Sequence, residues 1–315
     1  MKRSPEHGER VFVFGAGSVG RGLTRALRGA GVRATVRAAR AGLPRKIDAE
    51  LVVLAVRDGE LASLARRMAT AGTIGEGSAV VHVAGALGPG VLAPLRGVCA
   101  GVGQMHPLAA FAAVSTTPDL AGVSVYIRGD RTAVERARRA ARAMGMKPWT
   151  HANLDAERYH AAAGLVAGGT VALAAIATEL LVASGVARER TRGMVGRLIR
   201  SVGDNVDTLG LPHALTGPLR RGDVATVEGH IRAIRATVPE GFPLCLASTR
   251  AQLALARQIA DASPEALGII ERMLQAYSIN PRQTGIEHDL DLDCTQADHS
   301  QRERLAAHRK RERRL

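Results

Sequence analysis

Residues 10–20 read Arg10-Val-Phe-Val-Phe-Gly-Ala-Gly-Ser-Val-Gly20 and decide the fold of this chain. A short apolar run that ends at a glycine predicts a buried strand, and a helix is predicted to follow over about 19–28. Gly15 would permit a tight turn, Gly17 would let the backbone approach a pyrophosphate, and Gly20 would let the helix pack against the strand. The stretch therefore predicts the phosphate-binding turn of a dinucleotide-binding βαβ unit.

Short apolar segments recur along the first half of the chain, with helical segments between them. Further strands are predicted at 32–36, 51–56, 79–83, 98–102 and 123–128, and helices at about 59–71 and 132–144. Because these strands lack an alternation of polar and apolar residues, they indicate a parallel sheet that helices cover on both faces. We therefore expect an α/β protein, with a Rossmann doubly wound parallel sheet in residues 1–150.

Beyond residue 150 the pattern becomes helical. Residues 151–282 predict an all-helical C-terminal domain, interrupted at 211–222 by a turn that contains proline and glycine. Residues 283–315 have little apolar content and end in a basic run, which indicates a mobile charged tail. A length of 315 residues also favours two packed domains over one.

The first helical segment of this second half, at about 154–185, is unusually apolar. Its uncharged part, 161–178, is long enough to raise the question of a membrane span, but it consists mainly of alanine, glycine and threonine. Such segments partition weakly into lipid, so we predict a buried helix and no membrane span. Because one small domain cannot cover so many apolar faces, we also expect a symmetric homodimer formed through the helical domains.

The composition excludes several classes of protein. The chain has 43 basic and 29 acidic side chains, a formal charge of +14, and almost all of the basic excess is arginine. We interpret it as solvated arginine and expect no nucleic-acid partner, because no RNA-type aromatic motif or helix-turn-helix signature accompanies the charge. Three cysteines without ligand spacing predict neither a disulfide scaffold nor a metal site, and they favour a cytoplasmic location.

The end of the predicted second strand favours one dinucleotide over the other. No acidic residue stands there to accept hydrogen bonds from a ribose 2′-hydroxyl; Arg37 follows the strand, and Arg40 comes shortly after. Because a guanidinium pairs well with a 2′-phosphate, we predict NADP as cofactor rather than NAD. The turn and the helix N-terminus behind it would hold the phosphates. The residues predicted there are Gly15, Ala16, Gly17, Ser18, Val19 and Gly20.

Further candidate residues follow the other predicted strands. Ligands of open α/β sheets gather at the carboxyl ends of the strands, so residues just beyond those ends are candidates for contact with the cofactor. The candidates are Val56 and Arg57 after the third strand, His82 and Gly85 at the end of the fourth, and His106 after the fifth. A lone histidine is more often structural, but two histidines at one sheet edge make catalysis a comparable interpretation.

The helical half offers a second set of candidates. His160 opens the long helix, and Gly164 and Gly168 lie on the same face, which either packs against a helix or admits a flat ring. We predict His160 as the principal proton-transfer residue and His106 as its accompanying catalytic histidine. In the turn at 211–222, Thr216 and Arg221 are predicted to contact substrate. Asp223 is predicted to cap the helix that follows.

Several of these motifs together resemble a known protein family. They are GAGSVG at 15–20, LAVRD at 54–58, HVAGALG at 82–88, HPL at 106–108, RYHAAA at 158–163 and ALTGPLRRGD at 214–223. The chain resembles Rossmann-like bacterial proteins with a helical C-terminal domain of unknown function, which are similar in plan to pyrroline-carboxylate reductases, prephenate dehydrogenases and F420-dependent NADP reductases. The resemblance implies NAD(P)-dependent oxidoreductase activity and dimerisation. It also implies an asparagine where this chain has Gly168.

The sequence thus leads to two functional hypotheses. The first is a cytoplasmic NADP-dependent oxidoreductase that transfers hydride between nicotinamide and a small carbonyl, imine or hydroxy-acid substrate. The second is a non-catalytic dinucleotide-binding regulatory or scaffold protein, which Gly168 and the charged tail favour. Turnover of NADPH, measured beside its binding, separates the two.

Overall fold

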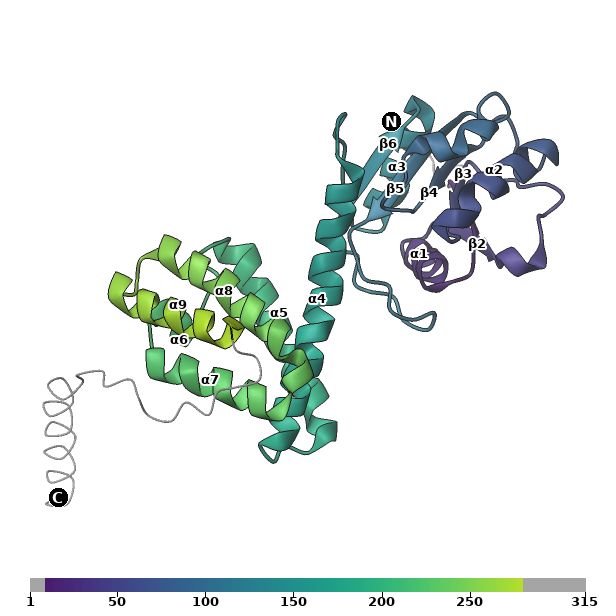
Figure 1. Ribbon diagram of the computed structural model, residues 1–315. Helices are drawn as coiled ribbons and strands as arrows, with labels where there is room; N and C mark the ends of the chain where they lie inside the picture. The colour runs from purple at the N-terminus through teal and green to yellow at the C-terminus, as the bar shows by residue number, and fades with distance from the viewer. Residues whose placement is uncertain (1–8, 280–315) are drawn as a thin grey trace, which may run out of the picture. The chain divides into compact units, whose positions relative to one another are not determined.

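The computed structural model describes residues 9–279, and this part of the chain divides after Ala172 into two compact units (Figure 1). The strands of the first unit are β1 (Arg10–Phe14), β2 (Arg33–Arg37), β3 (Leu51–Leu54), β4 (Ala79–His82), β5 (Gly101–Pro107), β6 (Ser124–Gly129) and β7 (Lys147–Trp149). Its helices are α1 (Ser18–Gly29), α2 (Leu61–Thr70) and α3 (Arg131–Ala143), with 3-10 helices at Ala39–Ala41, Asp58–Glu60 and Pro89–Leu95. Helix α4 (Ala156–Ala183) begins in this unit and ends in the second.

The sheet of the first unit has seven strands in the order β2-β1-β3-β4-β5-β6-β7. All neighbouring pairs are parallel except β5 and β6, which run antiparallel. The chain passes from β1 to β2 on one side and then crosses to β3 on the other, so the predicted doubly wound sheet is confirmed. The strand order therefore reverses between β1 and β3, and sheets of this kind bind ligands outside the carboxyl ends of the strands at such a point.

Two apolar cores cover the two faces of this sheet. Val11 and Val13 of β1 belong to one core, together with buried residues of α1 and α3. Phe14, on the opposite side of β1, belongs to the other core, together with α2 and the 3-10 helix Pro89–Leu95. Successive side chains of a strand point to opposite faces, so a strand covered on both sides must be apolar throughout.

One strand lies elsewhere than predicted. The fifth strand was predicted at 98–102, but β5 is Gly101–Pro107. Glycines at 101 and 103 weaken the strand signal. A Cβ on Gly103 would lie 2.9 Å from the Arg128 carbonyl of β6 and 3.2 Å from the Cβ of Ala133 on α3. The close approach of a helix therefore requires residues that are poor strand formers. As a consequence, His106 lies inside a strand and not after it.

The second unit is helical, as predicted. It holds the end of α4, then α5 (Arg188–Leu209), α6 (Pro218–Arg221), α7 (Val224–Thr237), α8 (Phe242–Ile259) and α9 (Pro264–Ile279), with a 3-10 helix at Pro239–Gly241. A single apolar core joins α6 to α9. Asp223 caps α7 as predicted, because its carboxylate accepts hydrogen bonds from the Thr226 N–H (3.1 Å) and hydroxyl (2.7 Å). The predicted tail, 283–315, lies outside the described residues.

Helix α4 differs from its prediction. It was predicted to be buried, but none of its residues is buried in the single chain, and the side chains of Leu165 and Val166 are 76% and 70% exposed. The prediction came from composition, which cannot say whether the covering surface belongs to the same chain. Among the described helices, α4 alone has the length and apolar composition of a membrane span, a test that core helices of soluble proteins also pass.

Candidate functional site

The glycine-rich turn has the geometry that its sequence predicts. Gly15 adopts a φ of 113°, and a Cβ there would clash with the Ala55 carbonyl at the end of β3. A Cβ on Gly20 would clash with the Gly15 carbonyl, so this glycine permits the close packing of α1 against the turn. Around Gly17 nothing lies within 4 Å of a Cβ position. The turn is therefore tight on its inner side and open where a phosphate would approach.

Helix α1 begins at this open side. Gly17 is its N-cap residue, and no side chain caps the helix. Its first backbone N–H groups are therefore available to an anion. A hollow of about 480 Å³ lies nearby, lined by Ala16, Arg21, Ala38, Ala39, Arg40, Val114 and Ser115. Two arginines beside a free helix N-terminus fit the phosphates of a dinucleotide, including a 2′-phosphate.

The two arginines predicted to bind the 2′-phosphate have different surroundings. Arg40 lines the hollow, but Arg37 donates from Nε to the Gly42 carbonyl (2.9 Å) and from Nη2 to the Ala41 carbonyl (2.6 Å). The guanidinium of Arg37 thus holds the loop that follows β2. Arg21 lines the hollow beside Arg40, and its Nε donates to the Ala16 carbonyl (3.1 Å).

Two histidines meet over a glycine at the carboxyl edge of the sheet. The rings of His106 and His160 lie 5.8 Å apart, centroid to centroid, with an angle of 71° between their planes. A Cβ on Gly85 would clash with both rings. The structure therefore brings together three residues, from β5, the start of α4 and the loop after β4, that the sequence singled out in separate segments.

Hydrogen bonding fixes the protonation of His106. Its Nδ1 lies 2.9 Å from the Val83 carbonyl, and because a carbonyl only accepts, Nδ1 carries the proton. Burial lowers the pKa of His106, and the neighbouring His160 lowers it further. At neutral pH this ring is therefore neutral, with Nε2 as an acceptor on the side of Gly85. The side chain of His160, in contrast, is exposed.

An aromatic wall stands beside the two histidines. Tyr159 lies 5.6 Å from His106, 5.7 Å from Tyr126 and 5.9 Å from Trp149, measured between ring centroids. Tyr126 donates its hydroxyl to the His151 carbonyl (2.9 Å), but the buried hydroxyl of Tyr159 has no partner in the described part of the chain. Burial raises the pKa of Tyr159, so this hydroxyl remains a proton donor at neutral pH.

Sequence reasoning missed this wall, although one signal pointed to it. Aromatic residues make up only 3% of the chain, and Trp149 is the single tryptophan. Because aromatic residues are so rare in this chain, the occurrence of Tyr126 and Trp149 in neighbouring segments is a signal that they could lie together at a site.

Gln104 and Arg128 form a second missed feature. Gln104 is buried; its Nε2 donates to the carbonyls of Ala84 (2.7 Å) and Gly85 (3.3 Å), and its Oε1 accepts from Arg128 Nε (3.1 Å). A Cβ on Gly88 would lie 2.6 Å from Arg128 Nη2, so the guanidinium lies beside the same loop. The spacing in the sequence could have indicated Gln104, because it lies two residues before His106 and therefore on the same face of the strand.

The remaining candidates of the first unit have less direct roles. His82 is completely buried, and its Nε2 lies 3.2 Å from the Gly88 carbonyl, so it holds the loop instead of facing solvent. Burial lowers the pKa of His82 to about 4. Val56 is half-buried next to Gly15, whereas Arg57 is exposed.

The candidates of the second unit, and Gly168 in the middle of α4, are not brought into this cluster by the described contacts. Thr216 lines a separate hollow in the helical unit, and Arg221 is exposed at the end of α6. Gly168 lies in α4, with nothing within 4 Å of a Cβ position. Their predicted roles toward substrate remain predictions.

Comparisons with known proteins agree with this architecture. Solved structures with a similar fold include a Bacteroides fragilis protein named "putative NADP oxidoreductase BF3122" (TM-score 0.58, 21% identity, covering 80% of this chain and 98% of that one). Protein TM1727 from Thermotoga maritima has a TM-score of 0.56 at 19% identity, covering 79% and 98% of the two chains. An imine reductase from Streptomyces aurantiacus has a TM-score of 0.51 at 17% sequence identity, and the match covers 84% of this chain and 99% of that one.

Comparisons of the sequence match separate parts of the chain instead of its whole length. No curated protein matches the sequence significantly. One family model, described as a Rossmann-like domain, matches residues 7–107, and a second, described as a domain of unknown function (DUF2520), matches residues 123–249. The two models thus match successive parts of the chain, the first over the parallel strands and the second over most of the helical region.

Proposed function

We propose that this protein is an NADP-dependent oxidoreductase that acts on a small carbonyl, imine or hydroxy-acid substrate. The observation that carries the proposal is the pair of histidines, His106 and His160, over Gly85 at the carboxyl edge of a sheet whose first turn is open to a pyrophosphate. Similar folds named as an NADP oxidoreductase and an imine reductase support it at the level of fold.

The chain's own residues supply a fitting binding site for the cofactor. The free N-terminus of α1 and the open side of Gly17 would hold the pyrophosphate, and Arg40 with Arg21 would hold the 2′-phosphate. A bound NADPH would supply the hydride in this reaction. We also propose a cytoplasmic homodimer, in which a second copy covers the apolar faces of α4 and α5.

Proton transfer is assigned to His160. Its imidazole is exposed to solvent, and an imidazole can both donate and accept a proton. His106 positions this ring and remains neutral, because its Nδ1–H is held by the Val83 carbonyl. The unpartnered hydroxyl of Tyr159 is a second candidate donor beside the histidines.

Arg128 suits a substrate that carries an acidic group. Its Nε is engaged by Gln104, which fixes the guanidinium beside the loop at 82–88. Within the described residues no hydrogen bond is found for its two Nη groups, and a guanidinium fork pairs well with a carboxylate. We therefore propose Arg128, in addition to the predicted Arg221, as a residue that binds an acidic group of the substrate.

A paired experiment tests the proposal. NADPH oxidation is measured across a panel of small aldehydes, ketones, 2-oxo acids and cyclic imines, and NADPH binding is measured by titration calorimetry on the same preparation. Turnover of one class supports the proposal. Binding without turnover of any class supports the second hypothesis, a dinucleotide-binding regulator, which Gly168 in place of the expected asparagine favours. Absence of binding contradicts both.

A further inference from the structure

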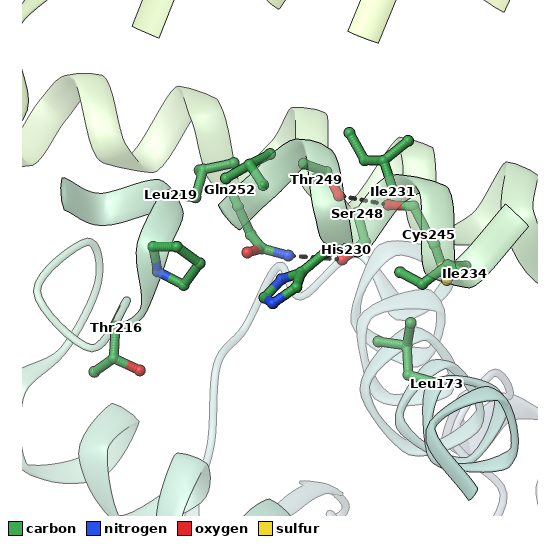
Figure 2. Close-up of a pocket in the computed structure, with 12 residues that line it drawn as sticks. Leu173, Thr216, Leu219, His230, Ile231, Ile234, Cys245, Ser248, Thr249 and Gln252 are labelled. Carbon is green, nitrogen blue, oxygen red and sulfur yellow. Dashed lines mark hydrogen bonds between the residues drawn. The ribbon is translucent and has the colours of Figure 1, made fainter. Parts of the chain in front are cut away.

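The helical unit contains a hollow of its own, separate from the histidine site (Figure 2). It measures about 230 Å³ and lies between α7 and α8, with α6, the turn before it and Leu173 of α4 contributing to its walls. Its lining residues are Leu173, Thr216, Pro218, Leu219, Val227, His230, Ile231, Ile234, Cys245, Ser248, Thr249 and Gln252. Binding sites for drug-sized molecules are usually larger, about 300–1,000 Å³, so this hollow suits a smaller molecule.

The walls of the hollow combine apolar surface with a few polar groups. Leu219, Val227 and Ile231 are buried members of the helical core and form apolar wall. Figure 2 shows the His230 ring from α7 and the Gln252 amide from α8 directed into the same space. An apolar hollow with a small number of convergent polar groups is the usual form of a small-molecule site.

Several of these polar groups still have hydrogen-bonding capacity. Gln252 donates from Nε2 to the Ser248 hydroxyl (3.2 Å), but in the part of the chain that the structure describes its Oε1 has no partner. In these described residues the His230 ring and the Thr216 hydroxyl also have no hydrogen-bond partner. By contrast, Thr249 uses its hydroxyl on the Cys245 carbonyl (2.9 Å). Three groups from three segments are thus free to contact a ligand.

We propose that this hollow binds a small, uncharged molecule with an apolar body and one amide, carbonyl or hydroxyl head. No lysine, arginine, aspartate or glutamate is among the lining residues, so a charged head would lose its water without gaining an ionic partner. An uncharged head instead meets the donors and acceptors of Gln252, His230 and Thr216, while the body covers apolar wall. The proposal does not depend on the oxidoreductase function.

Three probes that share a phenyl ring test the elements of this proposal separately. Benzamide carries an uncharged head, toluene has none, and benzoate carries a charge. Benzamide and benzoate are titrated to about 10 mM into the full-length protein, and toluene is titrated up to its solubility. This range detects millimolar dissociation constants, and binding is followed by two-dimensional NMR of the backbone amides. We expect benzamide to bind about tenfold more tightly than either of the others, with shifts concentrated in α7 and α8.

Three variants locate the binding. Gln252→Leu should weaken benzamide binding about tenfold, whereas Gln258→Leu, at an exposed position of the same helix, should leave it unchanged. Thr216→Val keeps the shape of the side chain and should weaken benzamide but not toluene. The proposal is wrong if benzamide does not bind, if benzoate binds as well as benzamide, or if Gln252→Leu and Gln258→Leu behave alike.

Discussion

The rings of His106 and His160 meet edge to face, 5.8 Å apart, although one belongs to a central strand and the other to the first turn of α4. Two constraints hold this pair. The Val83 carbonyl fixes the His106 ring through Nδ1, and the absence of a side chain at Gly85 leaves room for both rings. The geometry of the proposed site therefore depends on the loop after β4 as much as on the histidines.

Replacing the exposed histidine tests its proposed role in catalysis. His160→Ala should reduce turnover about a hundredfold, because a positioned general acid or base contributes roughly that much or more. NADPH affinity, measured by calorimetry, should stay nearly unchanged. His151→Ala, at an exposed position before α4, is the matched control and should retain full activity. An unchanged rate in His160→Ala would remove this residue from the mechanism.

A methyl group at position 85 should disturb both histidines at once. In Gly85→Ala the new Cβ would clash with the rings of His106 and His160, so at least one ring must move. Because a misplaced proton-transfer group costs much of its contribution, turnover should fall at least about tenfold. Gly90→Ala, where nothing lies within 4 Å of the new Cβ, is the control. Equal rates in the two variants would contradict the proposed geometry.

Local patterns predicted much of this molecule. The glycine-rich turn, the strands and the helices follow from short segments, and the carboxyl-edge rule correctly grouped His106 with Gly85. The aromatic wall could not be predicted in this way, because Tyr126 faces His106 only through the antiparallel register of β5 and β6. Pairing between distant segments leaves little trace in a single sequence.

The path of the backbone after β2 decides whether Arg37 or Arg40 faces the hollow proposed for the 2′-phosphate. Arg37 follows its strand directly, but the loop after it turns back and presents the carbonyls of Ala41 and Gly42 to its guanidinium. Sequence spacing does not reveal such a turn. Arg40, the second choice, is the one left facing the hollow.

The cofactor preference should therefore depend on Arg40. Arg40→Glu should weaken NADPH about tenfold or more relative to NADH, since it removes a charge-assisted hydrogen bond and adds a repulsive charge beside the 2′-phosphate. Fluorescence titrations with both cofactors measure the ratio. Arg33→Glu, at an exposed position of the preceding strand, controls for net charge. If the unmodified protein binds NADH as tightly as NADPH, the assignment of NADP is wrong.

His82 should make the first unit sensitive to acid. Burial lowers its pKa to about 4 in the folded state, whereas an unfolded histidine titrates near about 6.5. Between these values the unfolded state binds more protons. The free energy of unfolding should therefore be unaffected by protonation of His82 above about pH 6.5 and should decrease as the pH falls from there toward 4. The total loss from this one residue should be about 3 kcal/mol.

Urea unfolding at pH 7 and pH 4.5 measures this effect. His82→Gln places an amide near the Gly88 carbonyl and cannot be protonated, so it should lose less stability between the two pH values than the unmodified protein. His151→Gln, an exposed position in the same unit, should behave like the unmodified protein. The same acid-induced loss in all three proteins would mean that His82 does not titrate with unfolding.

The apolar surfaces of α4 and α5 should form the proposed dimer interface. On α5, Met194, Leu198, Val202 and Val206 repeat every four residues, and all four side chains are exposed. The arginines at 197 and 200 lie outside this stripe. One apolar stripe on an otherwise charged helix is typical of a surface that packs against protein. The first turn of α4 contacts the aromatic wall of the sheet, which favours a protein partner over a lipid one.

A second copy of the chain is the simplest partner, because a twofold axis lets one such surface cover its own counterpart. Leu198→Glu on α5 and Val171→Glu on α4 should each weaken the dimer about tenfold or more, since each would bury an unpaired charge. Arg200→Glu changes the charge of the same helix more strongly, but it lies off the stripe and should leave the dimer intact. Sedimentation velocity at micromolar concentration measures all three. A monomeric unmodified protein would contradict the dimer, and equal behaviour of Leu198→Glu and Arg200→Glu would place its interface elsewhere.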